Sequence, residues 1–167
     1  MISYLLGFSG YLVTLMLQLS VFSQWKILSG NADLLLLFVI AWCLYDRSKY
    51  LWLLVLIMAG TTIFVSAAPI YITLVVYVGV YLLSRQIHSR MWQTPLLAMI
   101  VLTFIASLAQ NALSIGTIFI RNIDINFSAA LIEIALPSLL LNMLLAIPVH
   151  ALVRELAYYA FPKGVEA

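Results

Sequence analysis

The sequence predicts an all-α membrane protein, a bundle of six transmembrane helices with both termini in the cytoplasm and no soluble domain. Of the 167 residues, 65% are hydrophobic, and the mean hydropathy is +1.14. Charged side chains comprise only 8 Lys and Arg and 6 Asp and Glu, whereas a soluble domain of this length would carry about 40. One helical span needs about 20 apolar residues, so six spans leave no room for a second domain.

The six spans are apolar stretches separated by charged and turn-forming residues. These stretches are continuously apolar, which favours helices over the alternating strands of a membrane barrel. Within a single membrane domain, 1–167, we place the spans at about 2–22, 31–46, 50–67, 69–84, 94–118 and 127–153.

The first two spans differ in how clearly their ends are marked. The stretch Ile2–Phe22 has no Lys or Arg before it, and its 21 residues exceed the apolar region of a usual signal peptide, so we expect it to be retained. After Asp33 only twelve uncharged residues follow, which rise about 18 Å as a helix. We therefore expect the second span to begin near Asn31 and Asp33 to reach the lipid headgroups.

The third and fourth spans come from one stretch, Leu51–Leu83, which holds 33 residues without a charge. As a single helix it would be about 50 Å long, against a hydrocarbon core of about 30 Å. Proline removes a backbone donor and disfavours helix in the residue before it. The segment Ser66–Pro69 therefore predicts a tight fold-back between two helices.

The distribution of positive residues supports this fold-back and sets the orientation. Cytoplasmic loops carry the excess of Lys and Arg. With the fold-back the division between the two sides is six to two, and without it five to three. The six residues predicted to be cytoplasmic are Arg47, Lys49, Arg85, Arg90, Arg154 and Lys163.

A polar seam is predicted between the last two spans. Glu133, Gln110 and Asn111 lie at similar depths, about 9 to 14 Å from the outer ends of their helices, so an amide can meet the carboxyl. An ionisable residue inside a membrane is by default a functional candidate. Glu133 can instead be protonated or hydrogen-bonded in the helix packing, or reach the headgroups, and the lack of a second titratable partner favours this structural role.

Pro137, Asn142 and Pro148 make the last span a second candidate region. The prolines are eleven residues apart, close to three turns, so they fall on one helix face and predict two bends. An amide between them can bond a neighbouring helix within the bundle or a partner's helix. Packing and partner binding are equally compatible with this pattern.

The sequence offers no catalytic, cofactor-binding or metal-ligating pattern, which argues against an enzyme. Cys43 is the only cysteine and lies in an apolar run, where we expect it to be buried. His88 and His150 lack the spacing of metal ligands, and we expect both at the membrane interface. The basic residues form no run that could follow phosphates, which argues against nucleic acid as a partner.

The run Pro137–Pro148, followed by Arg154, is the first of three segments with a family resemblance, and it is similar to the last helix of the rod shape-determining protein MreD family. Asn31–Leu37 resembles the family's Pro-Asp-Leu-Leu entry to its second helix, with Ala32 in place of the proline, and Ser66–Pro69 resembles its tight turn. Thr61–Val65 stands where the family often has an aspartate and several glycines, and that aspartate is absent here.

The resemblance implies a non-catalytic scaffold in the bacterial cytoplasmic (inner) membrane that supports cell shape and lateral peptidoglycan synthesis. The implied partner is MreC, and through it MreB, RodA and its transpeptidase, with the lipid bilayer as surroundings. Whether two copies form a homodimer stays open. The alternative is the substrate-binding membrane subunit of an energy-coupling-factor vitamin importer, which has a similar length and six-span layout and would need a pocket with convergent polar groups.

Overall fold

The structure is a computed structural model that describes residues 2–22, 32–46, 48–66, 68–88, 95–120, 128 and 130–161. These residues form helices and no strand, as the sequence predicts. The elements in chain order are α1 (Ile2–Leu17), the π-helical turn η1 (Gln18–Phe22), α2 (Leu34–Tyr45), α3 (Leu51–Val65), α4 (Ile70–His88), α5 (Pro95–Ile120), the π-helical turn η2 (Ala130–Ala135) and α7 (Leu136–Ala160).

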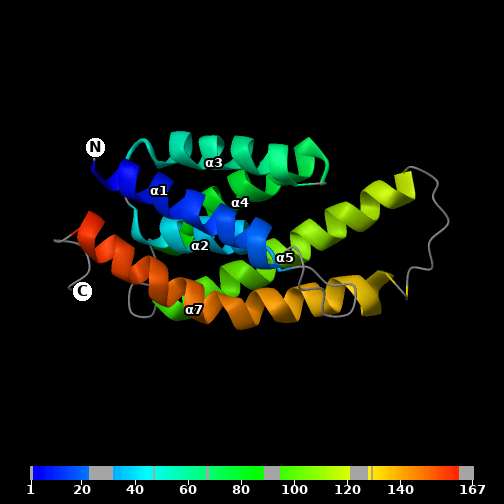
Figure 1. The fold of residues 1–167 in the computed structure, drawn as a ribbon. Coiled ribbons are helices and arrows are strands. Elements are labelled where there is room, and N and C mark those ends of the chain that lie inside the picture. The colour runs from blue at the N-terminus through cyan, green and yellow to red at the C-terminus, as the bar shows by residue number, and fades with distance from the viewer. Residues whose placement is uncertain are drawn as a thin grey trace.

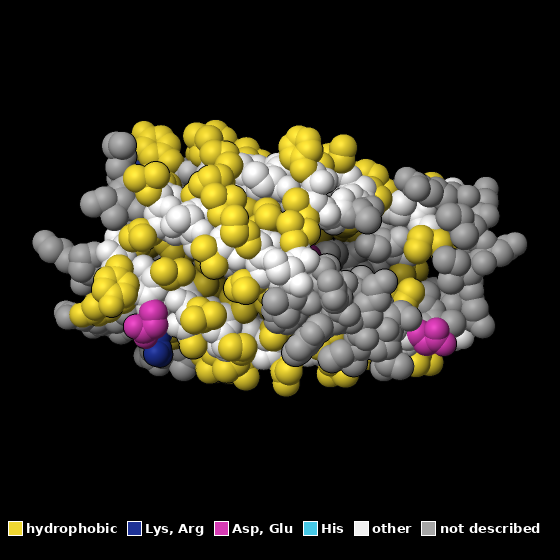
Figure 2. All heavy atoms as spheres, viewed as in Figure 1, with side chains coloured by type: hydrophobic (Ala, Val, Ile, Leu, Met, Phe, Trp, Pro, Cys, Tyr) yellow, Lys and Arg dark blue, Asp and Glu magenta, His cyan; other side chains and the backbone are white. Residues whose placement is uncertain are grey.

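Four helical segments are long and apolar enough to cross a membrane, namely Ser3–Ser20, Ile70–Ile87, Pro95–Ile120 and Leu131–Ala160. Hydrophobic side chains are spread over the described part of the face seen in Figure 2, and the charged side chains visible there lie towards the two ends of the molecule. The all-helical, membrane-compatible class is therefore confirmed. The count of six spans and the cytoplasmic position of the termini stay predictions, because α2 has 12 residues and α3 has 15.

The short helix α2 is the centre of the bundle (Figure 1). Every residue from Leu34 to Leu44 is buried, and α2 contacts α1, α3, α4, α5 and α7. A helix that is apolar on all sides is stable only when other elements surround it. Cys43 is among the buried residues, as the sequence predicts.

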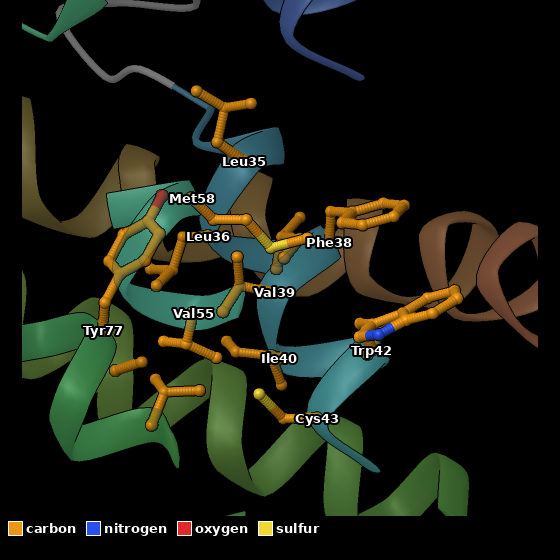
Figure 3. Close-up of a cluster of buried hydrophobic side chains, with 14 of the residues drawn as sticks. Leu35, Leu36, Phe38, Val39, Ile40, Trp42, Cys43, Val55, Met58 and Tyr77 are labelled. Carbon is orange, nitrogen blue, oxygen red and sulfur yellow. The ribbon is translucent and has the colours of Figure 1, made fainter. Parts of the chain in front are cut away.

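Side chains of α2 pack in two directions. In Figure 3, Leu36, Val39 and Ile40 lie on the side of Met58 and Tyr77, which come from α3 and α4. Larger rings point the other way, where Phe38 and Trp42 stack with ring centroids 6.0 Å apart.

The fold-back between α3 and α4 lies where the sequence predicts it. The α3 helix ends at Val65, α4 begins at Ile70, and the two helices pack against each other. Ser66 shapes the turn because its hydroxyl accepts a hydrogen bond from the backbone N–H of Ala68 at 3.1 Å. The physical reason is the one expected, since Pro69 cannot continue the preceding helix.

The helix α2 begins at Leu34, and the start of the second membrane span near Asn31 stays a prediction. Asp33 has a non-helical backbone, with φ −113° and ψ 81°, and its side chain caps a helix whose first residue is Leu34. An aspartate in this position favours a helix start because it accepts a hydrogen bond from an otherwise unpaired N–H group. Asn31 itself lies outside the described residues.

The helices α4 and α7 end four and seven residues later in the sequence than the predicted spans 69–84 and 127–153. The α4 helix runs to His88 and α7 runs to Ala160. Figure 1 shows the C-terminal half of α5 and the first turns of η2 and α7 reaching beyond the rest of the bundle, where they diverge. Pro137 lies where η2 passes into α7, and Pro148 lies inside α7; the two bends stay a prediction.

We expect Gly7→Ala to destabilise the protein by about 1–3 kcal/mol through overpacking. A Cβ atom at Gly7 would lie 2.7 Å from the indole ring of Trp42, which is buried and bonds Asp46 through its ring N–H. The matched control is Gly79→Ala, where nothing lies within 4 Å of the added atom. Thermal unfolding in detergent micelles measures both variants, and equal midpoints would contradict the close packing of α1 on α2.

Candidate functional site, the polar hub at the start of α2

Polar side chains from three helices meet at the first turn of α2, and we call this group the hub. Its members are Gln18, Asp33, Ser107, Gln110 and Asn142. The first N–H groups of any helix have no partner within that helix. Inside a bundle those groups need other acceptors, and the hub supplies them.

Asp33 satisfies the helix start with its own carboxylate. Its Oδ1 accepts a hydrogen bond from the backbone N–H of Leu36 at 3.0 Å. Its Oδ2 accepts one from the side-chain amide of Gln110, on α5, at 3.0 Å. The carboxylate also lies at the positive end of the α2 dipole, which stabilises a negative charge.

Asn142 joins α2, α5 and α7 through both ends of its amide. Its Oδ1 accepts a hydrogen bond from the backbone N–H of Asp33 at 2.8 Å, and its Nδ2 donates one to the hydroxyl of Ser107 at 3.0 Å. Both side chains are buried, with 4% and 1% of their surfaces exposed. The two hydrogen bonds also determine which way the amide is oriented.

Gln18 holds the backbone on both sides of Asp33. Its amide nitrogen donates to the carbonyl of Ala32 at 2.7 Å, and its amide oxygen accepts from the N–H of Leu34 at 2.9 Å. Gln18 is the first residue of η1, where α1 widens into a π-helical turn. The side chain of Gln18 thus joins the turn after α1 to the backbone at the start of α2 by two hydrogen bonds.

The hub lies level with the middle of the longest helix that contributes to it. Ser107 is twelve residues from Pro95 and thirteen from Ile120 in α5, which corresponds to about 18 and 20 Å. If α5 crosses the bilayer, this level is inside the hydrocarbon core of about 30 Å. The carboxylate of Asp33 is used inside the bundle, and the expectation that it reaches the headgroups stays a prediction.

A second polar cluster ties α1, α3 and α4 together. The Tyr11 hydroxyl donates to the carbonyl of Met58 at 2.8 Å and contacts the hydroxyl of Thr62, which in turn contacts the hydroxyl of Tyr77 at 3.0 Å. Thr61 also donates to the Tyr11 hydroxyl. All of these groups are neutral hydroxyls, and their arrangement serves helix packing.

The predicted seam of Glu133 with Gln110 or Asn111 is not formed. The Gln110 amide donates to Asp33, and the Asn111 amide donates to the carbonyl of Ala135 at 3.4 Å. Glu133 lies in η2, and its side chain is exposed. The prediction rested on equal depth along the two helices, but the side chain of Glu133 is exposed and the amide of Gln110 bonds the carboxylate that caps α2.

The three residues predicted to form a partner surface divide between the inside and the outside of the bundle. Pro137 and Asn142 are buried, and Pro148 is exposed. Asn142 therefore serves the packing of this chain. His150 is buried, at 5% exposure, and its Nε2 lies 2.9 Å from the Tyr45 hydroxyl; its position at the membrane interface stays a prediction. The side chain of His88 lies outside the described residues.

Sequence reasoning missed Asp33, Gln18 and Ser107 as members of the hub. One signal was present for Asp33, since an aspartate directly before an apolar run is a helix-start pattern. For Gln18 and Ser107 no local signal exists, because their partners lie on other helices.

Comparison with models of protein families, with curated proteins and with solved structures gives no match for this chain.

We expect Asn142→Leu to lower stability by about 1–3 kcal/mol, since the partly buried N–H of Asp33 would lose its acceptor. The control is Asn111→Leu, which removes one long contact of 3.4 Å and should cost about 0.6 kcal/mol or less. Chemical or thermal unfolding in micelles measures the difference. Equal effects of the two changes would show that the hub does not stabilise the bundle.

Two substitutions of Asp33 distinguish its role as a helix cap from the role of its negative charge. Asn is as good a helix cap as Asp, so Asp33→Asn should retain most of the stability, whereas Asp33→Leu should lose about 1–2 kcal/mol. Both variants are compared with the unchanged protein by thermal unfolding and by cellular function. If Asp33→Asn abolishes function at normal protein levels and stability, the carboxylate has an ionisable role beyond capping.

Proposed function

We propose that this protein is a non-catalytic scaffold of the bacterial cell-elongation machinery in the cytoplasmic membrane, as its resemblance to the MreD family implies. In this role it binds MreC and, through MreC, supports MreB, RodA and its transpeptidase during lateral peptidoglycan synthesis. The protein itself contributes a fixed arrangement of apolar helices.

One observation carries the proposal. The two longest segments that resemble the family, Asn31–Leu37 and Pro137–Pro148, are about a hundred residues apart in the sequence, and Asp33 and Asn142 join them by a hydrogen bond of 2.8 Å. Two segments that resembled the family only by chance would have no reason to lie in contact in the fold. Their contact supports the view that they form one structural unit, whose rigidity suits a scaffold.

The exposed face of α7 around Pro148 is the surface we assign to the partner's helix. Leu144 and Ile147 are 70% and 54% exposed there. Pro148 has no N–H to donate to the carbonyl of Leu144, and the bilayer core has no donor either. A polar side chain on the partner's helix would satisfy that carbonyl.

The hub also bears on the vitamin-importer alternative. Such a subunit needs polar side chains that converge on a ligand cavity. The amides of Gln18, Gln110 and Asn142 instead hydrogen-bond the start of α2 or its Asp33 cap. Their use within the bundle favours the scaffold.

Purification of the tagged full chain from native membranes tests the proposal. We expect MreC to co-purify, and Leu144→Trp to reduce its recovery several-fold because the larger ring blocks the exposed face of α7. The matched control is Leu53→Trp on α3, where the original side chain is also exposed, at 44%. A bound vitamin without MreC would overturn the scaffold assignment. Equal recovery of MreC with both variants would show that the partner's helix does not bind the exposed face of α7.

A further inference from the structure

His150 of α7 is a buried titratable side chain that neither the hub nor the proposed partner surface uses. Its Nε2 lies 2.9 Å from the hydroxyl of Tyr45, the last residue of α2. The two rings also lie against each other, with centroids 5.7 Å apart and 40° between their planes. At the other end of α2, Asn142 bonds the N–H of Asp33. Side chains of α7 therefore hold α2 at both of its ends.

The surroundings of His150 favour its neutral form. Arg154 lies four residues further along α7, on the same face of the helix, and its charge acts on both His150 and Tyr45. The carboxylate that Arg154 contacts is that of Glu155, at 3.4 Å, and both of these side chains are exposed. A proton on His150 would therefore place a second positive charge in a buried position beside the first, which costs free energy.

The elements that pack against α7 offer no free counter-charge to His150 in the described part of the chain. These elements are α1, α2, α5 and η2. The α5 helix has no titratable side chain, and those of α1 are tyrosines, which are neutral near pH 7. The carboxylate of Asp46 already accepts hydrogen bonds from an indole and a backbone N–H. Asp33 caps the opposite end of α2, and Glu133 of η2 is seventeen residues from His150, about 25 Å along the helix.

We propose that His150 and Tyr45 form a pH-sensitive lock between α7 and the end of α2, closed while His150 is neutral and released when it takes up a proton. In the neutral pair, the ring nitrogen and the phenol share a hydrogen bond. In a protonated imidazole both ring nitrogens are donors, so Tyr45 can only accept from it, and the added charge has no acidic partner. The proposal is independent of the scaffold role, because it rests only on this contact and its surroundings.

The direction of the pH dependence follows from which state binds the proton. The open or unfolded chain exposes the imidazole to water and binds a proton more readily than the locked bundle, so stability falls as the pH falls. An exposed histidine titrates near about pH 6.5. The loss of stability should therefore begin just below neutral pH and grow towards about pH 5.5, where the folding equilibrium constant is lower by up to about tenfold.

Thermal unfolding of the full chain in detergent micelles at pH 7.5 and 5.5 tests the lock. His150→Gln retains an amide that can bond Tyr45 but takes up no proton, so we expect it to lose most of the pH dependence. The chain has two histidines, and His88→Gln is the matched control that should keep the pH dependence of the unchanged protein. Equal pH dependence in both variants would overturn the proposal.

A direct measurement covers the case in which His150→Gln fails to fold. In the His88→Gln protein with ¹⁵N-labelled histidine, the remaining imidazole reports its own protonation by NMR. We expect a mostly neutral ring at pH 6.5 while the protein is folded. A ring that is half protonated or more at that pH would overturn the proposal.

Spin labels test whether protonation releases the helices. Tyr50→Cys, just beyond α2, and Tyr159→Cys, near the end of α7, place labels at two exposed positions, whereas Cys43 is buried. We expect the distance between the labels to lengthen or broaden at pH 5.5 relative to pH 7.5, and to do so much less when His150→Gln is added. The same distance at both pH values in a protein whose imidazole has titrated would show that no lock is released.

Discussion

The hydrogen bonding of the first turn of α2 is the constraint on which the bundle depends. A helix of 12 residues buried on every side cannot expose its free N–H groups to water, and leaving them unpaired in an apolar interior is costly. The chain supplies acceptors from three places: Gln18 of η1 accepts from the N–H of Leu34, the Asp33 carboxylate from that of Leu36, and Asn142 of α7 from that of Asp33. Gln110 of α5 donates to the Asp33 carboxylate and so ties α5 to the same turn. The positions of these three helices around α2 follow from that requirement.

The two polar clusters join different sets of helices. The hub joins α2 to α1, α5 and α7, and the hydroxyls of Tyr11, Thr62 and Tyr77 join α1, α3 and α4. Apolar packing alone specifies orientation weakly in lipid, since lipid tails compete for the same surfaces. Directional hydrogen bonds at two separate places make one arrangement preferable to its alternatives.

Features that depend on local composition could be predicted from the sequence. The helical membrane class follows from continuous apolar stretches, the fold-back from Pro69, and the burial of Cys43 from its apolar surroundings. The hub could not be predicted in the same way, because Gln110 and Asn142 could each bond several helices. Depth along a helix pointed to Glu133 as the partner of Gln110, but the direction in which a side chain faces depends on packing with other helices. The need for a cap at α2 selected Asp33 instead.

The distance in sequence between Asp33 and Asn142 has a consequence for how the protein is made. A ribosome that adds about 5–20 residues per second needs roughly 5–20 s to travel from the first residue to the second. During that interval the N–H groups of Leu34 and Leu36 already have their acceptors in Gln18 and Asp33, but the N–H of Asp33 lacks its partner Asn142. The hydrogen bonding at the start of α2 is therefore completed only when α7 packs against a segment translated much earlier.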